Sequence, residues 1–301
     1  MKKLSDEELI NELTKRFEEN RKAFQELKDL NEELRVVNKK LEESESLKSH
    51  FISNITNEIV NPFTSIIGLS RTILDVDKEN WKKVVSMVAL IHSEAFHLDF
   101  QLRNIFVAAK IEAGEINPEF VVADLRNLMD GVVGNFTHEA RKKRCAIKLV
   151  FAIEGYSGVG RYDFITDPEK FKLILSNLLS NAVNFSYEDS EVVVKVTRDA
   201  DILKVVVQDF GQGISELNQQ IIFDRFKRID SGINSLNRGH GLGLSINKAL
   251  LDVLNGRIEV VSSLGHGSTF SIFIPEASAA GNGGYASDAD EFFFGDEQQV
   301  F

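Results

Sequence analysis

The sequence contains little cysteine and proline and no long apolar run. Its 301 residues include one cysteine, Cys145, and four prolines. A single cysteine excludes an internal disulfide framework and fits a reducing compartment. No apolar run approaches the roughly 18 residues that a membrane-spanning helix needs, and the N-terminus lacks the apolar core of a signal peptide. We therefore expect a cytoplasmic chain with no direct membrane span.

Positive charge is also scarce. Lys and Arg number 35 against 46 Asp and Glu, which gives a formal net charge of −11. Binding to a nucleic-acid backbone needs clustered Lys and Arg, so this balance argues against nucleic acid as a partner. The remaining composition, 43% hydrophobic and 27% charged, is that of a globular chain. Its length has room for two modest domains.

The first part of the chain, residues 4–48, has neither glycine nor proline and carries charges of both signs. Apolar positions follow a heptad-like spacing at Ile10, Leu13, Phe17, Asn20, Phe24 and Leu27, and a second register follows at Leu27, Leu30, Leu34, Val37 and Leu41. This spacing predicts a parallel dimeric coiled coil with a stammer at Leu27. The alternative is a solvated helix that docks on its own domain. We expect the input signal to come from a partner, such as an upstream sensor, or from a portion outside this chain.

A second helix is predicted over residues 49–70. Its apolar face consists of Ile52, Ile55, Ile59, Phe63 and Ile66, at steps of 3, 4, 4 and 3 residues. Asn57 lies two residues from Ile55 and from Ile59, about 200° round the helix, and should face solvent. Glu58 and Asn61 are close to it, and Pro62 removes a helical hydrogen bond and should bend the helix. A polar, outward-facing turn in an apolar helix predicts a reaction site.

A third helix is predicted from Trp81 to the C-cap glycine Gly114, because apolar residues alternate at steps of 3 and 4 over four heptads. Two antiparallel helices would leave much apolar surface exposed, and two copies of the hairpin would bury it in a four-helix bundle. We therefore predict a homodimer.

From about residue 116 the periodicity changes to that of strands and helices in alternation. Helices are predicted at 128–139 and from Asp167-Pro168 onward, and strands at 146–151, 192–197 and 202–207. Residues 265–275 should form a turn into an edge strand. Together these elements predict an α+β sandwich, and the acidic stretch 278–301 should be disordered.

Several polar and glycine-rich segments of this region suit a nucleotide. Asn177, Asn181 and Asn184 lie on one face of the predicted helix, and amide oxygens can complete a Mg²⁺ shell without adding charge beside phosphates. In 209-DFGQGIS-215, Asp209 precedes two glycines, Gly211 and Gly213, which suits an adenine amine approached closely by the backbone. In 239-GHGLGLS-245, a glycine-rich turn opens a helix whose N–H groups can hold phosphates.

Taken together, these segments resemble two parts of sensor histidine kinases over residues 44–277. Phe51, Thr56, Glu58, Ile59, Asn61, Pro62 and Phe63 match the phosphoacceptor motif, and the later segments match the N, G1, F, G2 and G3 boxes of the Bergerat ATP-binding fold. The resemblance implies that Asn177 binds Mg²⁺, Asn181 lies by the phosphates and Phe185 stacks near adenine. It also implies that Asp209 binds the adenine amine and that Arg228 reaches the γ-phosphate. Further expected nucleotide residues are Gly211, Gly213, Phe223, Phe226, Gly239, Gly241, Leu242, Gly243 and Thr269.

Two positions depart from the family pattern. The phosphorylated histidine is replaced by Asn57, whose amide lone pair is delocalised and cannot attack phosphorus. A Lys or Arg is usual at the position of Asn184, so phosphate binding should be weaker. None of the remaining histidines stands in a matching motif, so we do not expect a substitute acceptor.

The resulting organisation has four parts: a coiled coil (1–48), a phosphoacceptor-like hairpin (49–114), an ATP-binding domain (115–277) and an acidic tail (278–301). The main functional hypothesis is an ATP- and Mg²⁺-binding histidine kinase of two-component signalling with a degenerate acceptor, whose partner is a response-regulator receiver domain. The alternative is a signalling pseudokinase that modulates another histidine kinase or a regulator and retains phosphatase activity. A Bergerat ATPase unrelated to signalling is disfavoured by the kinked helix.

Overall fold

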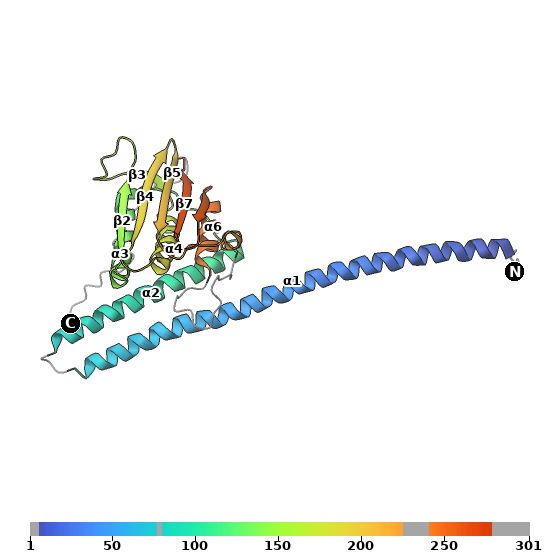
Figure 1. Cartoon of the computed structure of the whole chain (residues 1–301), viewed down its shortest axis with the longest axis horizontal. Coiled ribbons are helices and arrows are strands. Elements are labelled where there is room, and N and C mark those ends of the chain that lie inside the picture. Colours follow the sequence, from blue (N-terminus) through green and yellow to red (C-terminus); the bar gives the residue numbers. More distant parts are fainter. Residues whose placement is uncertain (1–5, 77–79, 225–240, 279–301) are drawn as a thin grey trace. The chain divides into compact units, whose positions relative to one another are not determined.

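The computed structural model describes residues 6–76, 80–224 and 241–278 (Figure 1). The chain divides into two units, Met1–Asn54 and Ile55–Phe301. Helix α1 (Asp6–Leu74) makes up the described part of the first unit and ends in the second. Helix α2 (Trp81–Ala113) ends at Gly114, which has the left-handed φ of 69° that the sequence predicted. Among the described residues, no helix is long and apolar enough to cross a membrane.

The apolar seam of the first unit is exposed in a single chain. Phe17 is 79% exposed, Phe24 72% and Leu27 65%. The same holds for Ile10, Leu13, Leu30, Leu34 and Val37, and the side chain of Leu41 lies outside the described residues. A row of large apolar side chains at heptad spacing is the surface that a second helix covers in a coiled coil.

In the second unit, the helical hairpin also exposes apolar side chains. Phe63, which the sequence placed on the buried face, is 56% exposed, and Val88 of α2 is 52% exposed. Towards its C-terminal half α2 packs on the following domain, where Phe96 and Phe100 contact the ring of Phe136 edge-on. Phe63 and Val88 are therefore large apolar side chains that remain more than half exposed in a single chain.

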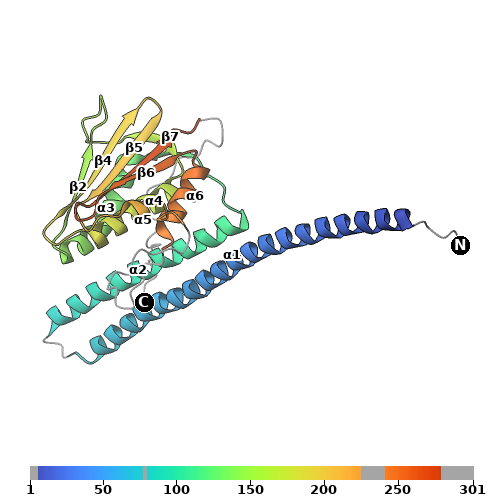
Figure 2. The same ribbon diagram turned by 45° about the vertical axis from the view of Figure 1, so that its right-hand side comes forward.

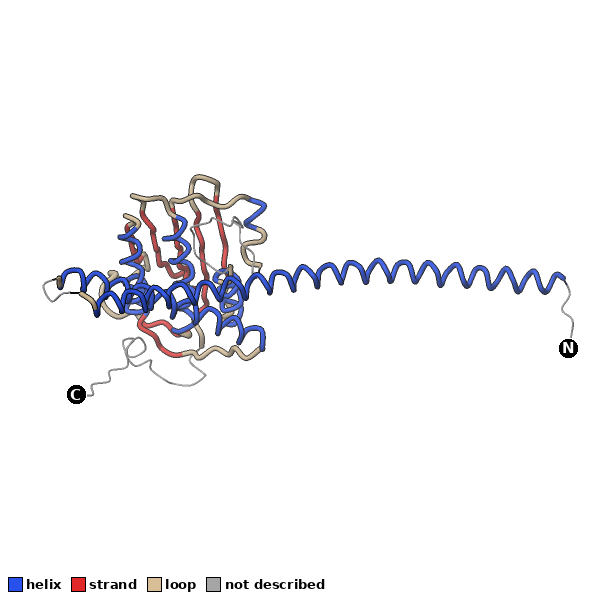
Figure 3. Tube along the Cα trace, turned by 90° about the horizontal axis from the view of Figure 1, so that it is seen from below, coloured by secondary structure: helices blue, strands red, loops and turns tan. Residues whose placement is uncertain are grey.

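A five-stranded sheet forms the scaffold of the C-terminal domain, in the order β2-β4-β5-β7-β6. Its strands are β2 (Ala146–Phe151), β4 (Glu191–Asp199), β5 (Ile202–Asp209), β7 (Ser268–Pro275) and β6 (Arg257–Ser262). Strands β2 and β4 are parallel and the other neighbours antiparallel, and the strands run side by side in Figure 3. A separate pair joins β1 (Val121–Asp124) to β3 (Asp163–Thr166).

Helices α3 (Leu125–Lys142), α4 (Pro168–Phe185) and α6 (Gly243–Val253) cover one face of this sheet (Figure 2). Alternate residues of the strands point into this layer, and Val194, Val205 and Ile272 have no exposed surface. The period of two places these residues on one face, which gives the predicted α+β sandwich. A short helix, α5 (Glu216–Gln219), follows β5.

Helix α4 begins where the sequence predicted. The Asp167 side chain accepts a hydrogen bond from the Lys170 N–H at 3.0 Å, and Pro168 occupies the first helical turn. The other Asp167 oxygen accepts from the Glu119 N–H at 2.8 Å. This buried carboxylate therefore fixes both the start of α4 and the chain that leads into the domain.

The prediction of an edge strand at residues 265–275 is wrong. Strand β7 pairs with β5 on one side and with β6 on the other. The edge position belongs to β6, which the sequence analysis did not predict. The alternate residues Phe270, Ile272 and Ile274 of β7 are buried, as expected for an interior strand with one face on the helices.

Candidate functional site

An interlocked pair of buried amides joins α4 to α6. Asn177 of α4 is 3% exposed, and its Nδ2 donates to Asn247 Oδ1 at 2.9 Å and to the Gly243 carbonyl at 3.4 Å. Asn247 has no exposed surface and donates from its own Nδ2 to the Ile174 carbonyl at 3.0 Å. Because its nitrogen makes these two hydrogen bonds, the Asn177 amide has a fixed orientation, and Oδ1 is the atom that could bind a cation.

The start of α6 lies against this amide. A Cβ at Gly243 would stand 3.3 Å from both Cγ and Oδ1 of Asn177, so glycine permits the close approach. The preceding Leu242 makes no side-chain capping hydrogen bond, and Gly241 has a φ of 69°. The first N–H groups of α6 thus have no side-chain cap, the condition under which a helix N-terminus binds an anion.

Asp209 ends strand β5 and is 4% exposed. Burial raises the pKa of its carboxyl group, while hydrogen bonds from the Gly211 N–H and from the backbone and hydroxyl of Ser268, together with the Lys143 charge, oppose that rise. The Gly211 N–H lies 3.1 Å from Oδ1. A buried carboxylate held in this way is a strong acceptor for an amine that donates hydrogen bonds.

Three glycines let main-chain segments cross beside Asp209. A Cβ at Gly211 would lie 1.9 Å from the Phe185 carbonyl oxygen, and one at Gly213 would lie 2.0 Å from the Ser263 oxygen. A Cβ at Gly267, where φ is 84°, would lie 2.0 Å from the main-chain carbonyl oxygen of Asp209. No other residue fits these crossings, so Gly211 and Gly213 of the predicted set occupy positions that only glycine tolerates.

Some of the other predicted residues lie among the residues that the structure describes, and some lie outside them. Asn181, Asn184 and Phe185 are half-buried on the last turns of α4, Phe223 is half-buried, and half-buried Thr269 pairs with Gln208 and Val261 in the sheet. Phe226, Arg228 and Gly239 lie outside the described residues. Asn57 and Glu58 belong to α1, but their side chains also lie outside the described residues, whereas Asn61 is exposed.

Sequence reasoning missed Asn247, Ser268, Gly267 and Lys143. Asn247 lies four residues after Gly243 on the same helix face, a spacing that could have revealed it. Lys143 belongs to the basic run 141-RKKR-144, which resembles a solvated surface.

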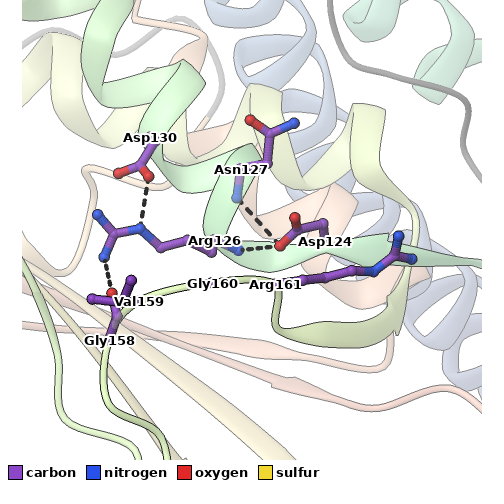
Figure 4. Close-up of a pocket in the computed structure, with 8 residues that line it drawn as sticks. All are labelled: Asp124, Arg126, Asn127, Asp130, Gly158, Val159, Gly160 and Arg161. Carbon is purple, nitrogen blue, oxygen red and sulfur yellow. Dashed lines mark hydrogen bonds and ion pairs between the residues drawn. The ribbon is translucent and has the colours of Figure 1, made fainter.

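A shallow pocket elsewhere is lined by Asp124, Arg126, Asn127, Asp130, Gly158, Val159, Gly160 and Arg161 (Figure 4). Its polar groups pair with one another: Arg126 donates from Nη1 to the Gly158 carbonyl at 2.7 Å and from Nε to Asp130 at 2.6 Å. None of its residues belongs to the site at Asn177 and Asp209, so it is a separate feature of the loop beside α3.

Comparison with known proteins identifies the class to which this site belongs. Residues 166–278 match the family described as histidine kinase-, DNA gyrase B-, and HSP90-like ATPase. The match includes Asn177, Asp209, Gly211 and Gly243, and it implies ATP binding. The chain therefore carries an ATPase domain of the histidine kinase type, and the mixed α/β fold with N-terminal helices agrees with histidine kinase catalytic domains.

The particular relatives are histidine kinases. The chain is 30% identical over 241 residues to the circadian input-output histidine kinase CikA of Synechococcus elongatus. The aligned residues make up 78% of this chain and 31% of that protein. The chain is 29% identical over 273 residues to the sensor histidine kinase GacS of Pseudomonas protegens, covering 89% and 29%. The fold is similar to that of full-length ShkA in complex with AMPPNP, with a TM-score of 0.53, 22% identity and coverage of 78% and 46%. The chain thus spans about a third of the curated relatives.

Proposed function

We propose that this chain is the ATP-binding part of a two-component histidine kinase whose own acceptor position, Asn57, is degenerate. The observation that carries the proposal is the buried carboxylate of Asp209. It lies beside glycines whose lack of a side chain lets neighbouring main-chain segments approach closely. A carboxylate is costly to bury, and its retention is explained by a ligand with a matching donor. The exocyclic amine of adenine is such a donor.

The residues fit ATP and Mg²⁺ in distinct ways. Asp209 would accept the adenine amine, Asn177 Oδ1 would bind the cation, and the uncapped N–H groups at the start of α6 would hold phosphate oxygens. Among the described residues, no group of three His, Cys, Asp or Glu could hold a metal, so amide and phosphate oxygens would form the cation shell. Bound Mg²⁺ would neutralise the negative charge that phosphoryl transfer must move.

The acceptor half of the chain is proposed to be inactive in self-phosphorylation. In a competent kinase the acceptor imidazole attacks the γ-phosphorus and a nearby carboxylate, here Glu58, assists removal of its proton. The phosphoryl group would then pass to an aspartate of a receiver domain. Asn57 has no available lone pair for the first step, so this chain would depend on another acceptor.

Asp209→Asn is expected to abolish most ATP binding with little change in stability. The amide keeps the shape of the side chain but cannot pair with the adenine amine in the same way, and we expect affinity to fall about a hundredfold, or ~2.7 kcal/mol. Burial raises the pKa of Asp209, so its ionised form is costly to fold at neutral pH. The amide removes that cost but also removes one acceptor for the hydrogen bonds from Gly211 and Ser268. The two effects oppose each other, so the melting temperature should change by only about a few degrees.

Titration calorimetry and thermal unfolding of the full chain would test this. The matched control is Asp201→Asn, since Asp201 is an exposed aspartate, and it should bind ATP normally. Undetectable binding by the unmodified chain at millimolar ATP, or unchanged binding by Asp209→Asn, would show that the site is wrongly assigned.

The exposed seam of α1 supports a parallel homodimer. We expect twice the chain mass by light scattering at tens of micromolar. Replacement of Phe17 and Phe24 by Ser should raise the dimer dissociation constant about tenfold or more, because each buried aromatic contributes on the order of 1 kcal/mol. Lys22→Ser, off the seam, should have no effect. A monomeric unmodified chain would contradict the homodimer.

A regulatory pseudokinase with residual phosphatase activity is the second candidate, supported by the exposed Asn61 next to the degenerate acceptor. An exposed amide can orient a water in line with a phosphoryl group. We expect this chain to accelerate decay of a matched phosphorylated receiver domain, and Asn61→Ala to slow it about tenfold, while Asn117→Ala does not. Equal decay with the unmodified chain and with Asn61→Ala would reject the idea.

A further inference from the structure

The C-terminal end of α4 has every one of its last four carbonyl groups satisfied. The Ser186 N–H donates to Ala182 at 3.0 Å, and the Gln212 N–H donates to Phe185 at 3.3 Å. The remaining two carbonyls, of Val183 and Asn184, both accept from the ammonium group of Lys143, the first at 3.0 Å. The last turn of α4 contains no basic residue of its own. The positive charge that complements this helix end therefore comes from Lys143, 40 and 41 residues earlier in the chain.

Lys143 is itself fixed at both ends. Its backbone N–H caps α3 through the carbonyls of Glu139 and Ala140, each at 3.1 Å. Burial lowers the pKa of its ammonium group, and the nearby Cys145, Glu188 and Asp209 oppose that shift. Ordering a lysine side chain costs conformational entropy, so it needs a compensating interaction. For Lys143 that interaction is the pair of hydrogen bonds to main-chain carbonyls, which hold the end of α4 in place.

The helix end that Lys143 holds is joined directly to the loop after Asp209. Gly211 forms an isolated β-bridge with Ser186, and the Tyr187 N–H donates to the Phe210 carbonyl at 3.4 Å. Within the same loop the Gly211 N–H donates to Asp209 Oδ1 at 3.1 Å. A shift of the end of α4 would therefore move the donor that orients the Asp209 carboxylate.

We propose that Lys143 is a positioning residue for nucleotide recognition, which clamps the end of α4 so that the loop after Asp209 keeps its binding geometry. This inference rests on the proposed function, because it assumes that Asp209 receives the adenine amine. The position of Lys143 is also relevant to Asn184, where the family pattern has a Lys or Arg. Here a cation stands at the same helix end, but it binds the main chain, so it acts through Asp209 and not by touching phosphate.

ATP affinity of full-length variants between pH 6 and pH 8 would test the proposal. We expect Lys143→Gln, which keeps a donor but loses the charge, to bind ATP about tenfold more weakly at pH 7. The Lys143 charge helps keep Asp209 ionised, so removing that charge raises the pKa of Asp209 further. As the pH is lowered, the ATP affinity of Lys143→Gln should therefore begin to fall at a higher pH than that of the unmodified chain. Lys143→Arg should restore most of the affinity and the original pH profile. Lys148→Gln, at an exposed site of β2, should behave as the unmodified chain.

Hydrogen exchange without nucleotide separates this inference from the proposed function. In Lys143→Gln the amides of Gly211 and Gln212 should exchange faster than in the unmodified chain and in Lys143→Arg, with little change in the strands. If the unmodified chain binds no ATP, the proposed function fails, and unchanged exchange at these two amides then rejects the clamp as well. If the unmodified chain binds ATP, an unchanged affinity of Lys143→Gln overturns the positioning role, as does a loss that Lys143→Arg shares in full.

Discussion

Asn57→His is expected to become phosphorylated on residue 57 when the full chain is incubated with ATP and Mg²⁺, whereas the unmodified chain stays unlabelled. The substitution supplies an imidazole nitrogen with a free lone pair where the amide has none. Helix α1 is continuous from Asp6 to Leu74, so its backbone is helical at position 57. The substitution therefore needs no change in the backbone at position 57.

The neighbourhood of position 57 favours this gain of activity. Glu58 could accept a hydrogen bond from one ring nitrogen and leave the other to attack, the arrangement a general base requires. The two-residue offset from Ile55 and Ile59 predicts an outward-facing side chain. The cost should come from Asn184, where the missing positive charge would slow transfer by about tenfold, equivalent to ~1.4 kcal/mol.

Radiolabelled ATP provides the measurement. The label on Asn57→His should be labile in acid and stable in alkali, as a phosphoramidate is. Thr64→His is the matched control, since Thr64 is exposed two turns further along the same helix face, and it should remain unlabelled. If Asn57→His binds ATP but takes up no label over hours, the defect extends beyond the acceptor and the pseudokinase hypothesis gains. Labelling of the unmodified chain would contradict the role given to Asn57.

Local patterns in the sequence were sufficient for much of this fold. The start of α4 follows from Asp167 and Pro168, which cap a helix by their own chemistry whatever surrounds them. Strand β2 was predicted with its observed bounds, Ala146–Phe151. The predicted site residues Asn177, Asp209, Gly211 and Gly243 form a motif that is recognisable from their types and order, and all four lie in the segment that matches the ATPase family; their roles toward a nucleotide stay predictions.

Features that depend on distant contacts could not be predicted in this way. The interior place of β7 follows from its pairing with β6, and a strand alone carries no sign of how many neighbours it has. Lys143 contacts carbonyls 40 and 41 residues later, and Asn177 meets Asn247 across 70 residues. The Lys143 contact leaves no local trace in the sequence, and the Asn177 contact leaves only the four-residue spacing of Gly243 and Asn247 on α6, although both contacts fix groups of the candidate site.

Gly211→Ala should have the largest structural effect in the candidate nucleotide site. The new Cβ would lie 1.9 Å from the Phe185 oxygen, 2.6 Å from the Phe185 carbon and 2.9 Å from the Ser186 Cα. All three are main-chain atoms, so no side chain can rotate away and the end of α4 or the loop itself must move. Such a clash belongs to the rare class of substitutions that cost about 3 kcal/mol or more.

The movement would also separate groups that we propose to bind ATP. It breaks the bridge between Gly211 and Ser186 and displaces the N–H that donates to Asp209. We expect the melting temperature to fall by about 6–12 °C and ATP affinity to fall by about a hundredfold or more. Differential scanning fluorimetry and calorimetry on the same preparations would measure the two effects.

Gly131→Ala is the matched control, because nothing lies within 4 Å of a Cβ at this position in the middle of α3. Alanine favours a helix over glycine by about 1 kcal/mol, so this variant should melt at an equal or higher temperature and bind ATP normally. A Gly211→Ala chain that melts and binds as the unmodified protein does would mean that the loop after Asp209 can leave the end of α4 freely. The close crossing at Gly211 would then have no part in recognising the nucleotide, and the clamp proposed for Lys143 would lose the contact through which it acts.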